Sequence, residues 1–292
     1  MSAATDGFRL VYDRAGDRAG DQAGGGPSAV LLHGWPGDRR DYRRVVPLLA
    51  GLDVVVPDLR GFGESDKHPA GPAAAYSAAA QARSVIALIE ELGLRNPLIA
   101  GYDIGSRIGQ RIAAERPGLL RGLVVAPPLP GIGSRILAVD AQREFWYQSF
   151  HQLALAERLI DGQPSAVRAY LEHFWSHWSG PSFRPAAADL DRLAGLYGQP
   201  GAFTASIAWY RAGSGSVAHS LAEQAPGPAD RVHVPTTVLW PRHDPLFPAA
   251  WSDRLDEFFD AVRLRWLPES GHFSPMEAPE VFAAEILAAA AA

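Results

Sequence analysis

Short runs of consecutive apolar residues recur near both ends of the chain, and segments with helical periodicity separate them. A strand that is buried on both faces is apolar along its whole length, as is typical of parallel sheets. The runs occupy residues 28–32, 52–57, 96–101, 119–126, 235–240 and 262–267, and arginines interrupt those at 119–126 and 262–267. Residues 8–12 alternate between apolar and polar side chains, which predicts a further, first strand.

The segments between these runs predict helices, at residues 41–49, 75–92, 104–115 and 251–259 and from residue 279 onward. Regular alternation of strand and helix predicts an α/β protein with a mostly parallel sheet flanked by helices. A glycine-rich polar stretch at residues 16–26 predicts a flexible hairpin loop.

The middle of the chain has a different residue pattern. From 131 to 230 the pattern is helical and rich in aromatic residues, and no buried strand is predicted there. An unstructured loop of that length would be unusual in a compact domain. We therefore predict an α/β core formed by residues 1–130 and 231–292, interrupted by a helical lid, or cap domain, at residues 131–230.

The amino-acid composition excludes several classes of function. The net charge is −5 and no basic stripe is visible, so nucleic acid is not an expected partner. The chain has no cysteine, which excludes disulfides, thiol catalysis and cysteine-ligated zinc. No apolar run is long enough for a membrane span, and the N-terminus does not read as a secretory signal. We expect a cytoplasmic protein that needs no metal or organic cofactor.

One motif carries the sharpest chemical signal. Gly101-Tyr102-Asp103-Ile104-Gly105 lies between an apolar run and a helical segment. A glycine–x–nucleophile–x–glycine turn at such a place projects the central side chain at the start of a helix, where negative charge is favoured. A carboxylate is already ionised at neutral pH and needs no base to activate it. The alternative is a structural role, in which Asp103 only caps the N-terminus of the helix.

Two further residues follow in the order nucleophile, acid, histidine. Asp244 comes directly after the run at 235–240, and His272 comes after the run at 262–267. Parallel sheets build their sites at the carboxyl ends of their strands. We therefore predict that His272 is a base oriented by Asp244. Alone, each could be an ordinary loop residue.

A third element, His33-Gly34-Trp35-Pro36, follows the run at 28–32. The backbone N–H groups of Trp35 and Ile104 could form an oxyanion hole, and the Trp35–Pro36 bond is a candidate for the cis form. The alternative is a plain strand-to-helix turn.

Together these motifs resemble the α/β-hydrolase superfamily over nearly the whole chain, and the resemblance implies an eight-stranded sheet. The aspartate at the turn, the His33–Pro36 motif and the lid resemble the epoxide hydrolase branch. Enzymes of that branch use two lid donors, usually tyrosines, to protonate the epoxide oxygen. Tyr210 resembles one donor, and either Trp146 or Tyr147 resembles the other. Further aromatic and polar residues are predicted to line the pocket, namely His33, Phe150, Trp175 and Trp209.

Haloalkane and haloacetate dehalogenases share the aspartate, but the match to them is incomplete. Haloalkane enzymes usually have a tryptophan after the nucleophile, where this chain has Ile104. Haloacetate enzymes carry an arginine there and another three residues later. Only Arg107 matches, and a structural role is at least as good an interpretation of it.

We therefore predict an epoxide hydrolase that opens a small, largely apolar epoxide to a vicinal diol through an ester on Asp103. The alternatives are a dehalogenase that uses the same aspartate and a non-catalytic, ligand-binding relative. A homodimer is compatible with the sequence.

Overall fold

A seven-stranded sheet forms the centre of the computed structural model, which describes residues 1–16 and 26–291. The strand order is β1-β3-β2-β4-β5-β6-β7. Only β1 is antiparallel to its neighbour, and the other pairs are parallel. The bounds are β1 Tyr12–Ala15, β2 Ser28–Leu32, β3 Asp53–Pro57, β4 Leu98–Gly101, β5 Gly122–Val125, β6 Thr236–Pro241 and β7 Val262–Leu267. The mostly parallel α/β fold is confirmed, with seven strands in the described residues where eight were expected.

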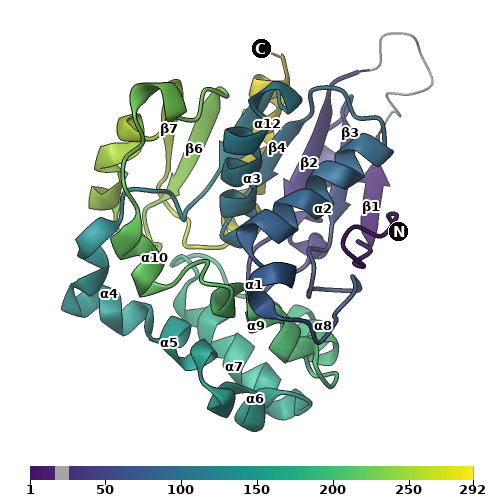
Figure 1. Cartoon of the computed structure of the whole chain (residues 1–292), viewed down its shortest axis with the longest axis vertical. Helices are drawn as coiled ribbons and strands as arrows, with labels where there is room; N and C mark the ends of the chain where they lie inside the picture. Colours follow the sequence, from purple (N-terminus) through teal and green to yellow (C-terminus); the bar gives the residue numbers. More distant parts are fainter. Residues whose placement is uncertain (17–25, 292) are drawn as a thin grey trace.

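Burial along the strands explains why their sequences are so apolar. Every residue of the five strands β3, β2, β4, β5 and β6 is buried, whereas β7 at the edge alternates between exposed and partly buried positions. Helices cover both faces (Figure 1): α2 (Ala78–Glu91) and α3 (Ile104–Glu115) lie in front of the sheet and α12 (Pro279–Ala291) lies behind it.

Three local predictions need correction. The first strand is β1 rather than residues 8–12, because the sheet edge exposes Asp13 while Arg14 pairs with the buried Asp53 of β3. Segment 41–49 forms two 3-10 turns, Arg39–Tyr42 and Val46–Leu48, because Pro47 interrupts a helix. Segment 251–259 is also a 3-10 stretch, Ala249–Glu257. Residues 17–25 of the predicted hairpin loop lie outside the described residues.

The chain between β5 and β6 contains helices only, apart from loops and turns. Figure 1 shows α4 to α9 gathered beyond one end of the sheet. The bounds are α4 Val139–Glu144, α5 Trp146–Gln152, α6 Ala154–Ile160, α7 Pro164–His177, α8 Ala187–Tyr197, α9 Ala202–Arg211 and α10 Val217–Ala222. We call residues 131–230 the helical segment. Its status as a separate domain stays a prediction.

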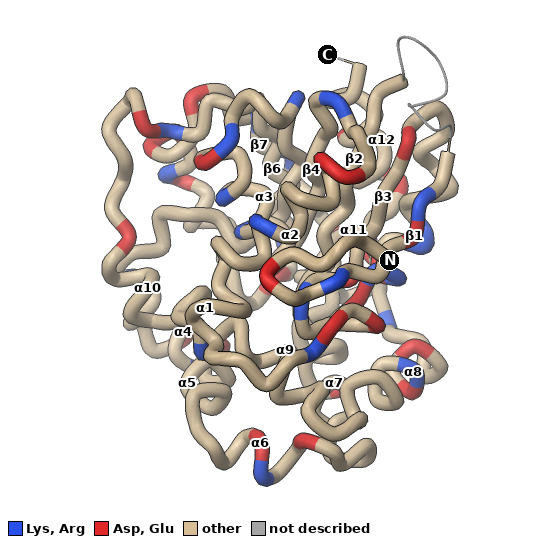
Figure 2. The backbone as a smooth tube through the Cα atoms, turned by 45° about the vertical axis from the view of Figure 1, so that its right-hand side comes forward, with Lys and Arg blue, Asp and Glu red and all other residues tan. Residues whose placement is uncertain are grey.

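The charge distribution fits the sequence analysis. Figure 2 shows lysine and arginine interspersed with aspartate and glutamate along the backbone, with no continuous basic band over the part of the chain it describes. No helix among the described residues is long and apolar enough to cross a membrane. Within the same residues, no cluster of three or more His, Cys, Asp and Glu side chains could hold a metal ion.

Candidate active site

The turn between β4 and α3 has the tight geometry that its glycines predicted. Asp103 has φ +50° and ψ −127°, a conformation that is strained for a residue with a side chain. A Cβ on Gly101 would lie 2.7 Å from the backbone of Gly105, and a Cβ on Gly105 would lie 2.1 Å from the carbonyl oxygen of Leu32. Only glycine therefore fits at either side of Asp103.

Asp103, His272 and Asp244 form a buried hydrogen-bonded chain. Nδ1 of His272 lies 2.8 Å from Oδ2 of Asp244, and Nε2 lies 3.3 Å from Oδ2 of Asp103. Oδ1 of Asp244 accepts from the backbone N–H of Leu246 at 2.9 Å, which fixes that carboxylate. The structure thus brings together three residues that are far apart in the sequence and that were predicted to meet.

The two carboxylates control the protonation of His272. Burial by itself would lower the pKa of the imidazole, but the neighbouring Asp244 and Asp103 outweigh burial and raise the pKa to about 10. In the resting protein the imidazole therefore carries a proton at neutral pH and forms ion pairs with both aspartates. It can act as a base only after one of these charges is removed.

Glu277, which the sequence analysis missed, holds the loop that carries His272. Its carboxylate accepts from the backbone N–H groups of Gly271 and Gly180 at 2.8 Å each and of Phe273 at 3.0 Å. The N–H of His272 itself donates to the carbonyl of Trp178 in the helical segment. Gly271 and Phe273 are near Glu277 in the sequence, but Gly180 lies 97 positions away, so the complete set of partners is visible only in the fold.

The predicted oxyanion-hole residues lie beside Asp103. The backbone N–H of Trp35 donates to Oδ1 of Asp103 at 2.6 Å, and the Trp35–Pro36 peptide is cis, as considered from the sequence. Ile104 is the first residue of α3, and the N–H groups of the first helical turn have no partner within their helix. The Trp35 N–H therefore contacts the carboxylate, and the role of the Ile104 N–H stays a prediction.

A small pocket of about 40 Å³ opens at Asp103, between the sheet and the helical segment. Both Tyr147 and Tyr210 line it, and their rings lie 5.6 Å apart. Burial raises the pKa of each phenol well above its usual value, so both hydroxyls keep their protons at neutral pH. Ile104, Phe145, Trp209 and Phe247 contribute apolar wall.

Four predicted site residues do not line this pocket. The ring of Trp146 is 41 % exposed and borders a separate surface hollow with Tyr170 and His173. Tyr147, the next residue on α5, does line the pocket with Asp103. Phe150 packs on the rings of Trp146 and Tyr170.

The other two corrections concern residues with structural hydrogen bonds. Nε1 of Trp175 donates to the carbonyl of Pro36 at 2.9 Å, and its ring stacks on Phe273. Nε2 of His33 accepts from the N–H of Leu59 at 3.0 Å, while Nδ1 lies 2.9 Å from the carbonyl of Gly34. Burial lowers the pKa of His33, so it stays neutral, and its two hydrogen bonds fix the turn.

Polar side chains also line the pocket, namely Arg107, Gln148, His219 and Ser220. The guanidinium of Arg107 is already engaged: it contacts Glu223 at 3.2 Å and the carbonyl of Leu129 at 3.2 Å. Glu223 also accepts from the N–H of Gly131 at 2.7 Å. Arg107 therefore joins α3 to the two ends of the helical segment.

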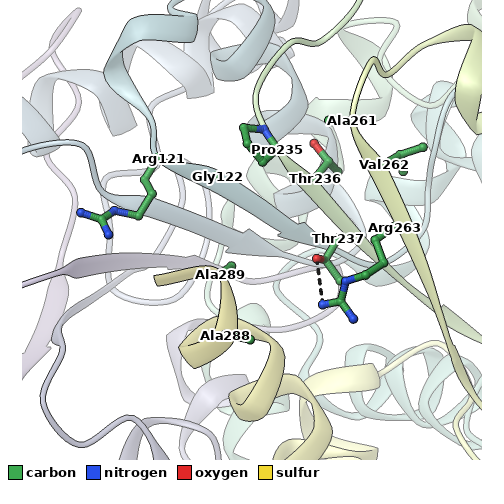
Figure 3. Close-up of a pocket in the computed structure, with 10 residues that line it drawn as sticks. All are labelled: Arg121, Gly122, Pro235, Thr236, Thr237, Ala261, Val262, Arg263, Ala288 and Ala289. Atoms are coloured by element: carbon green, nitrogen blue, oxygen red, sulfur yellow. Dashed lines mark hydrogen bonds between the residues drawn. The ribbon is translucent and has the colours of Figure 1, made fainter. Parts of the chain in front are cut away.

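A more open hollow exists at the opposite edge of the sheet, where β5, β6 and β7 begin (Figure 3). Its two arginines have internal partners. Arg121 donates to the carbonyl of Ala290, and Arg263 contacts Thr237 and Glu285. No nucleophile or base from the Asp103 site reaches it, so we place the chemistry in the smaller pocket.

Comparison with known proteins agrees with this geometry. Residues 27–279 match the family of the alpha/beta hydrolase fold, so the chain belongs to the α/β-hydrolase family. Within that family it is similar to epoxide hydrolases. The soluble epoxide hydrolase of Corynebacterium sp. (strain C12) is 26 % identical over 291 residues, covering 95 % of this chain and 92 % of the relative.

Other relatives point to both chemistries considered from the sequence. A fluoroacetate dehalogenase of Burkholderia sp is 32 % identical over 196 residues, which cover 65 % of this chain and 64 % of that protein. A solved epoxide hydrolase structure from metagenomes of hot environments has a TM-score of 0.80 at 25 % identity, covering 100 % of this chain and 97 % of the other. The protein is thus an epoxide hydrolase-like α/β hydrolase.

Proposed function

We propose that this protein hydrolyses epoxides to vicinal diols through a covalent ester on Asp103. One observation carries the proposal: two protonated phenols, Tyr147 and Tyr210, line the same buried pocket as the Asp103 carboxylate. An epoxide needs a nucleophile on carbon and a proton donor on oxygen. The pocket offers both, on residues of the core and of the helical segment, which we regard as a cap domain.

In the first step, Oδ2 of Asp103 attacks an epoxide carbon and the C–O bond breaks. Oδ2 is the attacking atom because Oδ1 accepts from the N–H of Trp35. A tyrosine, Tyr147 or Tyr210, gives its proton to the departing oxygen, and such general acid help contributes roughly 10²–10⁴-fold. The products of this step are a hydroxyalkyl ester and a tyrosinate.

Ester formation also prepares His272. It removes the negative charge of Asp103, one of the two charges that raise the pKa of the imidazole. The proton on His272 then returns, through solvent, to the tyrosinate. The neutral imidazole takes a proton from water, and the hydroxide attacks the ester carbonyl. The oxyanion forms on Oδ1, beside the N–H groups of Trp35 and Ile104. Its collapse releases the diol, whose leaving oxygen takes the proton from His272. The carboxylic acid left on Asp103 then gives its proton to His272, which restores the resting state.

A dehalogenase is the second candidate, because a relative with that name matches two thirds of the chain. Two features of the pocket favour the epoxide. The side chain of Ile104, next to the nucleophile, cannot donate to a halide, and the charge of Arg107 is balanced by Glu223 instead of being free for a carboxylate. A non-catalytic relative would have no need for a complete hydrogen-bonded chain from Asp103 to Asp244.

The test is intact-mass analysis of a His272→Gln variant after incubation with styrene oxide, fluoroacetate or a chloroalkane. Removing the base should leave the ester trapped. We expect a mass gain equal to the whole epoxide, absent in Asp103→Asn. His243→Gln is the matched control, because His243 is an exposed histidine on the loop of Asp244. This variant should hydrolyse the ester normally and show no trapped adduct.

The alternatives give different masses. An adduct formed only from a halo compound, lighter than that compound by one hydrogen halide, would replace the epoxide proposal with a dehalogenase. No adduct from any of the three, combined with binding of the epoxide, would identify a non-catalytic relative.

A further inference from the structure

One buried polar atom in the pocket has no partner. Gln148 is only 8 % exposed, and it lines the pocket together with Asp103 and Tyr147. Its side-chain oxygen, Oε1, makes no hydrogen bond with any of the described residues. Buried polar atoms almost always have a hydrogen-bond partner, so a buried polar atom without one in a pocket needs a specific explanation.

The position of Gln148 sets where the missing partner must lie. Gln148 follows Tyr147 on helix α5, and both side chains line the pocket. A group that reaches Oε1 is therefore close to the phenol that would donate to the epoxide oxygen. The partner belongs to the substrate, on a carbon near the epoxide ring.

The surrounding charges define the chemistry of that partner. Oε1 is an acceptor, so the partner must donate. Arg107 lines the same pocket, but its charge is balanced by Glu223, so it offers no free charge to an ionic group. Burial lowers the pKa of His219, which leaves it neutral and offers no charge to attract an ion. A hydroxyl is the neutral donor that fits.

We propose that Gln148 is a specificity-determining residue that selects epoxides bearing a hydroxyl on the carbon next to the ring. The inference rests on the proposed function, since it names the substrate class of the same pocket. The hydroxyl donates to Oε1 of Gln148 while the epoxide oxygen faces Tyr147 and Tyr210. An otherwise apolar pocket would thus bind an epoxy alcohol in one orientation.

Binding can be measured without turnover. In an Asp103→Asn background, the dissociation constants of 3-phenylglycidol and trans-β-methylstyrene oxide are compared by calorimetry, since the two differ by a single hydroxyl. We expect the alcohol to bind about tenfold more tightly, the size of one net hydrogen bond. A Gln148→Met change should reduce that ratio to about one, since methionine has a similar length but lacks the amide.

The ratio of the two dissociation constants reports only the contribution of the hydroxyl group, because any effect of Gln148 on Tyr147 changes the binding of both ligands alike. Gln163→Met is the matched control: Gln163 is exposed in the helical segment and outside the pocket, so this change should leave the ratio intact. The methyl ether of 3-phenylglycidol cannot donate and should bind no better than the deoxy compound.

A ratio near one in the Asp103→Asn background, or a preference that survives Gln148→Met, would overturn the proposal. So would a preference for the methyl ether equal to that for the alcohol. Because binding is read without chemistry, these outcomes are independent of the mass experiment. A hydroxyl preference lost in Gln148→Met, with no epoxide adduct on Asp103, would leave the role of Gln148 standing and remove only the hydrolytic mechanism.

Discussion

The backbone N–H of Trp35 donates to Oδ1 of Asp103 at 2.6 Å, while Oδ2 of the same carboxylate faces His272 at 3.3 Å. The two oxygens are therefore not equivalent. One is held where an oxyanion would develop, and the other is positioned to attack. This asymmetry makes the path of each oxygen atom predictable.

We expect a single turnover in ¹⁸O-labelled water, with enzyme in excess over epoxide, to give a diol without label. The diol takes its new oxygen from Asp103, and the carboxylate regains one oxygen from water. Mass spectrometry of the diol and of the peptide containing Asp103 measures both. Label in the diol during the first turnover would mean that water attacks the epoxide directly.

The two tyrosines should have overlapping roles. We expect Tyr147→Phe and Tyr210→Phe each to lower kcat/KM for an epoxide by about 10- to 100-fold, because one phenol remains as donor, and the double variant to lose most of the roughly 10²–10⁴-fold acid contribution. Trp146→Phe should change kcat/KM less than twofold, since Trp146 lies outside the pocket. A larger loss in Trp146→Phe than in Tyr147→Phe would reverse the assignment of the second donor.

His272 should make the stability of the protein depend on alkaline pH. Its pKa is raised to about 10 in the folded protein, above the value of about 6.5 expected when unfolded. The stabilisation is therefore fully present below about pH 6.5 and is lost as the pH rises toward 10. We expect the free energy of unfolding in urea to fall between pH 7 and 9.5 more steeply in the wild type than in His272→Gln.

His243→Gln serves as the control for this measurement and should keep the slope of the wild type. Equal slopes in the wild type and His272→Gln would show that the two aspartates do not hold the proton on His272.

The turn at Asp103 should not tolerate a methyl group. In Gly105→Ala the new Cβ would meet the carbonyl oxygen of Leu32 at 2.1 Å, so we expect loss of folded protein or a large drop in melting temperature. Gly195→Ala, in helix α8 with open space around it, should instead stabilise the protein by about 0.5–1 kcal/mol. Calorimetry of both variants tests this, and a fully stable Gly105→Ala protein would contradict the tight packing of the turn.

The sequence by itself determined the elements that depend on local rules. Continuous apolar runs identified the buried parallel strands, and Gly101 and Gly105 identified the turn at Asp103. Asp244 and His272 could also be assigned, because the carboxyl ends of parallel strands meet at one edge of a sheet. Errors fell where local pattern is weak, as at the edge strand β1 and at the proline-interrupted segment 41–49.

Only the tertiary structure decided which side chains of the helical segment reach Asp103. Trp146 and Tyr147 are neighbours with similar chemistry, and the rotation of α5, set by packing against α9 and the core, turns Tyr147 inward. The partner of Arg107 is Glu223, 116 positions further along the chain, and the unpaired oxygen of Gln148 appears only once the pocket is closed around it. Such contacts depend on the packing of distant segments, and no short motif encodes that packing.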